Sequence, residues 1–177
     1  MEPITTLIPM PEAMKKIFEE TFDNSTDSII AAVILAPICE ELFCRGLILR
    51  GLLSTRTPLS AILWSAFIFA FIHMNPWQGI AAFSLGCLMG WVYYRTHSLL
   101  LCMLMHFTNN SLAMVMQFIF PEAEADDTLM SLLPSTTYWI IYIVAIFAAV
   151  FAITLLNKRL NGKEEIISFK VSSVDKA

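Results

Sequence analysis

Hydrophobic residues are gathered along the chain in long runs that short polar segments separate. The runs cover Ser28–Leu53, Leu59–Asn75, Trp77–Arg95, Ser98–Phe120 and Thr137–Leu156. A helix needs about 20 residues to cross a bilayer, so the runs predict about five membrane-spanning helices. A transmembrane β-strand would alternate polar and apolar residues over about ten positions, and no run does so. The pattern therefore predicts an all-α, polytopic transmembrane helical bundle.

The polar flanks divide the chain into three parts. Residues 1–27 are expected to form an amphipathic helix at the membrane interface, or a linker, because four apolar residues share one helical face. The apolar residues of that face are Met14, Ile17, Phe18 and Phe22. Residues 28–156 are the expected transmembrane domain, and residues 157–177 form a polar tail.

Composition and charge narrow the class further. Hydrophobic residues make up 57% and charged residues 15%, whereas soluble domains average about 45–50% and about 25%. This excludes a soluble enzyme domain and a disordered chain, and a net charge of −4 excludes a nucleic-acid binder. Arg50, Arg56, Arg95 and Lys158 all fall on one side of the predicted bundle. The positive-inside rule makes that side, and the C-terminal tail, cytoplasmic.

Small residues and cysteines in the runs have structural explanations. Ala82, Gly86 and Gly90 repeat every four residues, a spacing that predicts close contact between two membrane helices. The cysteines contain no CxxC pair, so neither a disulfide framework nor a thiolate metal site is indicated.

Ionisable residues inside the runs are the candidate functional groups, because each costs about 2.5–3.5 kcal/mol at the centre of a bilayer. These residues, with one amide, are Glu40, Glu41, Arg45, His73, His106 and Asn110. Glu41 and Arg45 are four positions apart and are predicted to pair. Glu40 points about 100° away from them and needs water, a proton or a partner from another helix. His106 and Asn110 share one helical face. The depths of these residues overlap, which predicts one polar cavity in the bundle.

This set is sufficient to hydrolyse a peptide bond without a Ser nucleophile, a Cys nucleophile or a metal. A carboxylate beside an imidazole can polarise a water molecule, and an imidazole N–H with an Asn amide can stabilise an oxyanion. No cofactor is expected for that chemistry. Glu40, His73 and His106 could instead hold Zn²⁺ with an open position for water, although the chain has no HExxH helix. A zinc metalloprotease is therefore the first alternative. A non-enzymatic immunity or scaffold protein and a proton-coupled transporter are the others.

The motifs that contain these residues resemble the signatures of the CAAX-protease and bacteriocin-processing family of intramembrane endopeptidases, called CPBP or Abi, which are type II CAAX prenyl endopeptidase-like. Residues 40–45 fit EExxxR, residues 69–73 fit FxxxH, and residues 106–110 fit HxxxN. The resemblance implies that 28–156 is a catalytic domain. The implied roles are a base for Glu40, a water-holding group for His73, oxyanion donors for His106 and Asn110, and support for Glu41 and Arg45.

The resemblance also implies the surroundings of the protein. The expected partners are a peptide or protein substrate, lipidated in some relatives, and the lipid bilayer, with no nucleic acid. The expected location is the bacterial plasma membrane, and bacteriocin self-immunity is one of the processes to which such proteins are tied.

Overall fold

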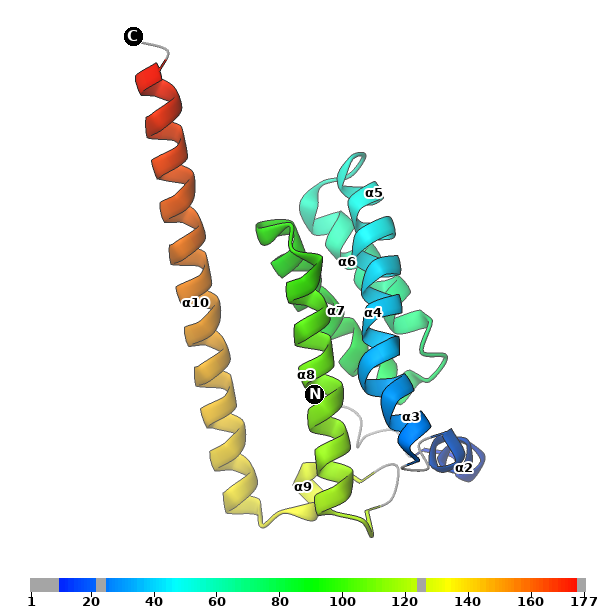
Figure 1. Cartoon of the computed structure of the whole chain (residues 1–177). Helices are drawn as coiled ribbons and strands as arrows, with labels where there is room; N and C mark the ends of the chain where they lie inside the picture. The colour runs from blue at the N-terminus through cyan, green and yellow to red at the C-terminus, as the bar shows by residue number, and fades with distance from the viewer. Residues whose placement is uncertain (1–9, 22–24, 124–126, 175–177) are drawn as a thin grey trace. The chain divides into compact units, whose positions relative to one another are not determined.

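Regular secondary structure is entirely helical in the part of the chain that the structure describes. The computed structural model describes residues 10–21, 25–123 and 127–174, without the side chains of residues 17–21 and 160–174. The chain divides into two compact units, Met1–Thr128 and Leu129–Ala177, whose helices are labelled in Figure 1. The prediction of an all-α fold is confirmed.

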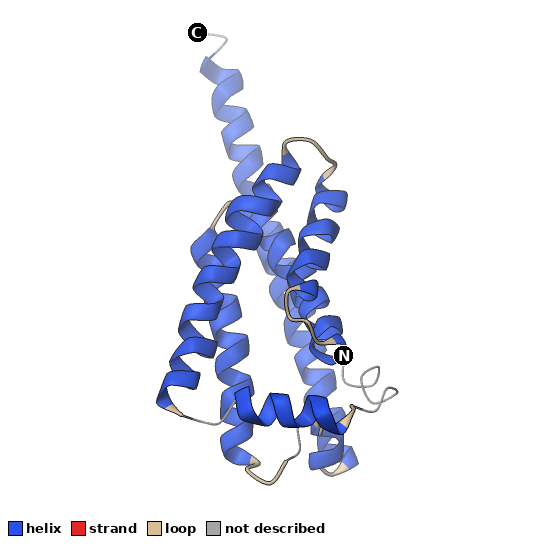
Figure 2. Cartoon of the chain, turned by 90° about the vertical axis from the view of Figure 1, so that its right-hand side faces the viewer, coloured by secondary structure: helices blue, strands red, loops and turns tan. Residues whose placement is uncertain are grey.

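The first helix of the first unit lies crosswise to the longer helices of the same unit. Helix α2 spans Glu12–Thr21, and the two views show its axis across those of α7 and α8 (Figures 1 and 2). Of its predicted apolar face, only the side chain of Met14 is described, because those of Ile17, Phe18 and Phe22 lie outside the described residues. The interfacial role of residues 1–27 stays a prediction.

The first hydrophobic run forms a helix that switches twice from the α to the π hydrogen-bond register and back. Its segments are α3 (Thr26–Ile30), the π-helix η1 (Ala31–Leu35), α4 (Ala36–Glu41), the π-helix η2 (Leu42–Leu49) and α5 (Arg50–Leu53). Ser25 begins it as the N-cap, because its side chain accepts a hydrogen bond from the Ser28 N–H at 3.2 Å. Within η1 the Ala36 N–H donates to the Ala31 carbonyl, five residues back. Such π segments are often found at functional sites.

The second and third runs form a helical hairpin. Helix α6 spans Pro58–Phe71 and helix α7 spans Pro76–Thr96. Both begin with a proline, which suits the first helical position because an N–H there would have no acceptor within the helix. Asn75 caps α7, since its Oδ1 accepts from the Trp77 N–H at 3.0 Å.

The small residues of α7 lie against α6, as their spacing predicts. A Cβ atom at Gly86 would lie 3.1 Å from the Ala66 Cα atom, and one at Gly90 would lie 3.2 Å from the Ile62 side chain. Ala82, Gly86 and Gly90 are all buried. The two helix backbones therefore approach too closely at Gly86 for any larger residue to fit without a shift.

Helix α8 completes the first unit and contacts both α4 and α7. It spans Leu99–Ile119, and the Ser98 hydroxyl caps it by accepting from the Leu101 N–H at 3.2 Å. The chain turns into it at His97, which has a left-handed φ of 52° and ends α7 by donating its N–H to the Tyr93 carbonyl. This contact with α4 brings the fourth run against the carboxylates of the first.

Two described helices are long and apolar enough to cross a membrane, α8 and the Ser135–Arg159 part of α10. Helix α10 spans Ser135–Val174 and follows the short helix α9 (Leu129–Leu132) in the second unit. It continues past the predicted end of the last span at Leu156. Helix α6 is apolar but has only 14 residues, and the π segments divide the first run into shorter helices. The arrangement with five spans stays a prediction.

Candidate active site

A buried ion pair within the first run contacts a histidine of α8. Arg45 Nη1 lies 2.8 Å from Glu41 Oε1, and both side chains are fully buried. The same carboxylate oxygen lies 3.0 Å from His106 Nδ1, whose side chain is 3% exposed. The pairing of Glu41 with Arg45 that their spacing predicts is present. His106 is the further partner, which comes from another helix.

Arg45 also joins the first run to the α6–α7 hairpin. Its Nη2 donates to the Gly86 carbonyl at 3.1 Å, and its guanidinium carbon lies 4.5 Å from the centre of the Phe69 ring. A guanidinium over an aromatic face is attracted by the ring quadrupole. The Ser65 hydroxyl donates to the Cys44 carbonyl at 3.0 Å beside this cluster. Four helical segments therefore converge on one buried guanidinium.

Glu40 faces the other nitrogen of the same imidazole. Its Oε2 atom lies 3.9 Å from His106 Nε2, and its side chain is 26% exposed. This distance is too long for a direct hydrogen bond, which spans about 2.7–3.2 Å, and Oε2 is buried without any direct hydrogen-bond partner. Because the Glu41 carboxylate accepts from Nδ1, the nitrogen of His106 that is left for chemistry is Nε2. One imidazole thus stands between two carboxylates of different exposure.

Phe69 brings the two candidate histidines together. Its ring centre lies 5.0 Å from that of His73 and 5.4 Å from that of His106, both in edge-to-face arrangements. His73 Nδ1 lies 2.7 Å from the Phe69 carbonyl, so this nitrogen is the donor and Nε2 is left as an acceptor. The phenyl ring itself is 1% exposed. Phe69 therefore fixes the ring of His73 and packs against His106.

Asn110 contacts the first run at a point that precedes the glutamates in the chain. Its Nδ2 donates to the Ala32 carbonyl at 2.8 Å, and its Oδ1 accepts from Asn109 Nδ2 at 3.2 Å. A primary amide carries two N–H donors, so the bond to Ala32 uses one of them. His106 and Asn110 therefore project from one face of α8 toward the same helix, as their spacing predicts.

The described residues offer no ready metal site. No group of three or more His, Cys, Asp or Glu side chains lies close enough together in them to hold a metal ion. The four cysteines are free. The predicted zinc ligands, Glu40, His73 and His106, are therefore not gathered as a ligand set in this conformation.

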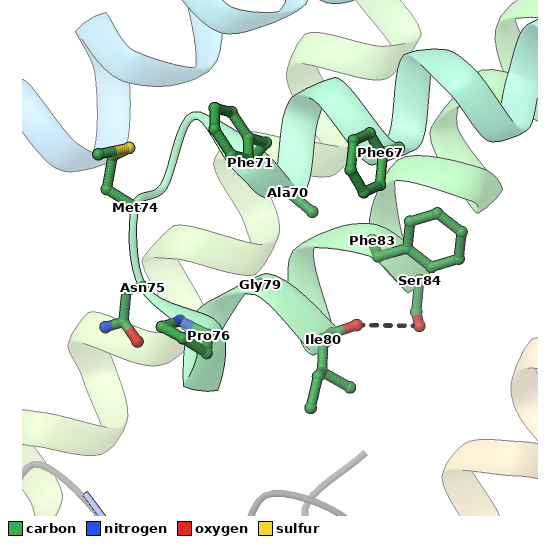
Figure 3. A pocket seen from close by; sticks show the side chains of 10 residues that line it. All are labelled: Phe67, Ala70, Phe71, Met74, Asn75, Pro76, Gly79, Ile80, Phe83 and Ser84. Carbon is green, nitrogen blue, oxygen red and sulfur yellow. Dashed lines mark hydrogen bonds between the residues drawn. The ribbon is translucent and has the colours of Figure 1, made fainter.

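An apolar cavity lies between the end of α6 and the start of α7 (Figure 3). Its volume is about 610 Å³. The residues that line it are Phe67, Ala70, Phe71, Met74, Asn75, Pro76, Gly79, Ile80, Phe83 and Ser84. Its polar side chains bond to nearby backbone, since the Ser84 hydroxyl donates to the Ile80 carbonyl at 3.1 Å and Asn75 caps α7. The loop that holds His73 forms one edge of this cavity.

Some groups at the site could not be found by reading ionisable residues alone. Ser65 and Phe69 are the clearest examples of such groups. Their sequence positions do indicate them, because residues 65, 69 and 73 are spaced four apart and so continue one helical face toward His73. The carbonyl groups of Gly86 and Ala32 left no signal, because every residue carries a carbonyl.

Comparison with known families classifies the chain. Residues 24–112 match the Rce1-like family, described as type II CAAX prenyl endopeptidase Rce1-like. The chain belongs to the Rce1-like family. The match covers half of the chain and contains every residue of the cluster around His106. The α9–α10 unit lies outside it. No curated protein and no solved structure shows a significant match.

Membership of the Rce1-like family has direct consequences. The family consists of proteases, which implies that this chain is a protease and that its substrate is a peptide or a protein. Together with the two apolar helices, membership indicates a membrane protein.

Proposed function

We propose that this Rce1-like protein is an intramembrane endopeptidase in which Glu40 activates a water molecule. The observation that supports this most strongly is the position of His106 between two carboxylates, with Nδ1 bound to Glu41 and Nε2 3.9 Å from Glu40. Glu40 is the more exposed of the two acids. It is therefore the one that water and substrate can reach, while Glu41 is occupied by Arg45.

In the proposed reaction, Glu40 removes a proton from water while the oxygen attacks the scissile carbonyl. The carbonyl oxygen becomes an oxyanion, and His106 and the second N–H of Asn110 donate hydrogen bonds to it. Glu40 then passes its proton to the leaving nitrogen as the C–N bond breaks. His73 Nε2 accepts from the water and helps to hold it. To donate through Nε2 while Nδ1 donates to Glu41, His106 carries a proton on both nitrogens in this step.

The proposed substrate is a prenylated CAAX peptide. The family description supports this choice, and so does an apolar pocket of about 610 Å³ between the end of α6 and the start of α7 (Figure 3), which is lined by residues on both sides of His73 in the chain. Such a volume lies within the range of about 300–1,000 Å³ that is usual for small-ligand sites. We propose further that the protein spans the plasma membrane with its C-terminal tail in the cytoplasm, on the basis of the basic residues at the predicted span ends.

The deciding experiment measures cleavage of a farnesylated CAAX peptide by detergent-purified protein that carries Glu40→Gln. The amide keeps the shape of the side chain but cannot take the proton, so we expect activity to fall by at least 100-fold, as is usual for loss of a general base. Glu122→Gln is the matched control, because Glu122 is exposed and lies outside the site. Full activity of the Glu40→Gln protein would refute the mechanism.

Two outcomes would favour an alternative function. Stoichiometric zinc in chelator-washed protein, with activity lost on its removal and regained on its return, would favour a metalloprotease. Protection of cells against a bacteriocin that is unaffected by Glu40→Gln would favour a non-enzymatic immunity protein. Comparison of cellular peptides with and without the active protein would identify the natural substrate.

A further inference from the structure

The first run has a backbone carbonyl that its own helix cannot satisfy. In η1 the hydrogen bonds run from residue i to residue i−5, as the bond from the Ala36 N–H to the Ala31 carbonyl shows. In that register the Ala32 carbonyl would take the N–H of residue 37. Residue 37 is a proline, which has no N–H to donate. Pro37 is itself buried.

Asn110 supplies the missing donor from another helix. Its Nδ2 lies 2.8 Å from the Ala32 carbonyl oxygen, which is a good length for an N–H···O bond. Four residues before it on α8, His106 bonds to Glu41 at 3.0 Å. Helix α8 is therefore fastened to the first run at two points, one on each side of Glu40 along the chain.

We propose that Asn110 is a positioning residue that holds the proline break of the first run against α8 and so sets the separation of Glu40 from His106. This inference rests on the proposed function and adds a role for Asn110 beyond oxyanion donation. The two N–H groups of one amide can serve both roles at once. Catalytic groups must be held to within about 0.5 Å by the surrounding structure, and the bond from Asn110 adds to the one at Glu41 a second polar contact between α8 and the first run.

The test is a double-mutant cycle between Asn110 and Pro37. An alanine at position 37 has an N–H that can reach the Ala32 carbonyl, so Pro37→Ala makes the bond from Asn110 redundant. We expect Asn110→Ala to speed hydrogen exchange of the amides of residues 33–41 by about tenfold, the effect of one lost hydrogen bond. In the Pro37→Ala chain the same substitution should change exchange by less than about twofold. An equal effect in both chains would overturn the proposal.

Cleavage of the farnesylated CAAX peptide provides the functional readout. We expect Asn110→Ala to lower kcat at an unchanged KM, and the loss to be about tenfold smaller in the Pro37→Ala chain, because only the oxyanion contribution is then missing. A purely oxyanion-binding Asn110 would give the same loss of kcat in both chains, and an Asn110 that only stabilises the helix would speed exchange without a coupled loss of kcat; either result would overturn the proposal. Thr108→Ala is the control on the same helix, since Thr108 is exposed and its hydroxyl donates to the Leu104 carbonyl.

Two arrangements keep the inference testable by itself. The exchange measurement is repeated in the Glu40→Gln chain, which needs no turnover, so that a failure of the proposed mechanism leaves this result interpretable. If Pro37→Ala prevents folding, Asn110→Asp decides the matter. Its carboxylate has no N–H and faces a carbonyl, so exchange of residues 33–41 should rise at least as much as in Asn110→Ala. Unchanged exchange in both Asn110 variants would overturn the proposal.

Discussion

Removal of the Arg45 guanidinium should destabilise the first unit more than any other single change of a charged residue at the site. Arg45→Met keeps much of the side-chain volume but leaves the fully buried Glu41 carboxylate without its cation. Breaking a buried ion pair in this way costs about 3–5 kcal/mol. The Gly86 carbonyl, 3.1 Å from Nη2, loses its contact with the guanidinium as well.

Thermal unfolding of the detergent-solubilised protein measures this effect. For a chain of this size each kcal/mol shifts the midpoint by about 2–4 °C, so Arg45→Met should lower Tm by about 6–20 °C. Arg50→Met is the matched control, because Arg50 is exposed one turn later on the same run, and its Tm should change by less than about 2 °C. Adding Glu41→Leu to Arg45→Met should restore part of the loss, since the Glu41 carboxylate is then no longer buried without its cation. An Arg45→Met protein as stable as the starting protein would refute the argument that this pair organises the site.

Three further changes test other parts of the structure. Gly86→Ala places a methyl group 3.1 Å from the Ala66 backbone and should lower the free energy of unfolding by about 1–3 kcal/mol. Gly51→Ala is the control, because a methyl group there meets nothing within 4 Å, and it should be neutral or stabilising in the same thermal melts. Phe69→Leu removes the ring that contacts both histidines, so kcat for the farnesylated peptide should fall about tenfold or more with intact folding by circular dichroism, and an unchanged kcat would show that this ring does not align them. His73→Ala should abolish cleavage while the Tm changes little, because its side chain is only half-buried, and retained activity would remove His73 from the mechanism.

Contacts within one helix were predictable from the sequence, since they depend on residue spacing alone. A turn of 3.6 residues places Glu41 beside Arg45 and Phe69 beside His73, and both pairs are present. The small residues at positions 86 and 90 predicted a close helix contact for the same reason, although not which helix would fill it. Hydrophobic run length predicted helices correctly but gave no information on their interruptions. Pro37 marked where a hydrogen bond had to be lost, yet the switch to a π register over η1 and η2 depends on what packs beside them.

Contacts between helices depend on how the helices pack, and residue spacing along the chain does not specify which helices or which residues meet. Nothing in the first run indicated that the imidazole of His106 would lie between Glu40 and Glu41, because those residues are far apart in the chain and meet only when α8 docks. The partners of Arg45 on α7 and of Asn110 on the first run are backbone carbonyls, which exist at every position, so the sequence does not mark which of them a side chain will reach. The sequence by itself therefore determined the reactive groups and their pairs within one helix. Only the tertiary structure, in which α8 and the α6–α7 hairpin dock on an interrupted helix, arranged these groups as a site.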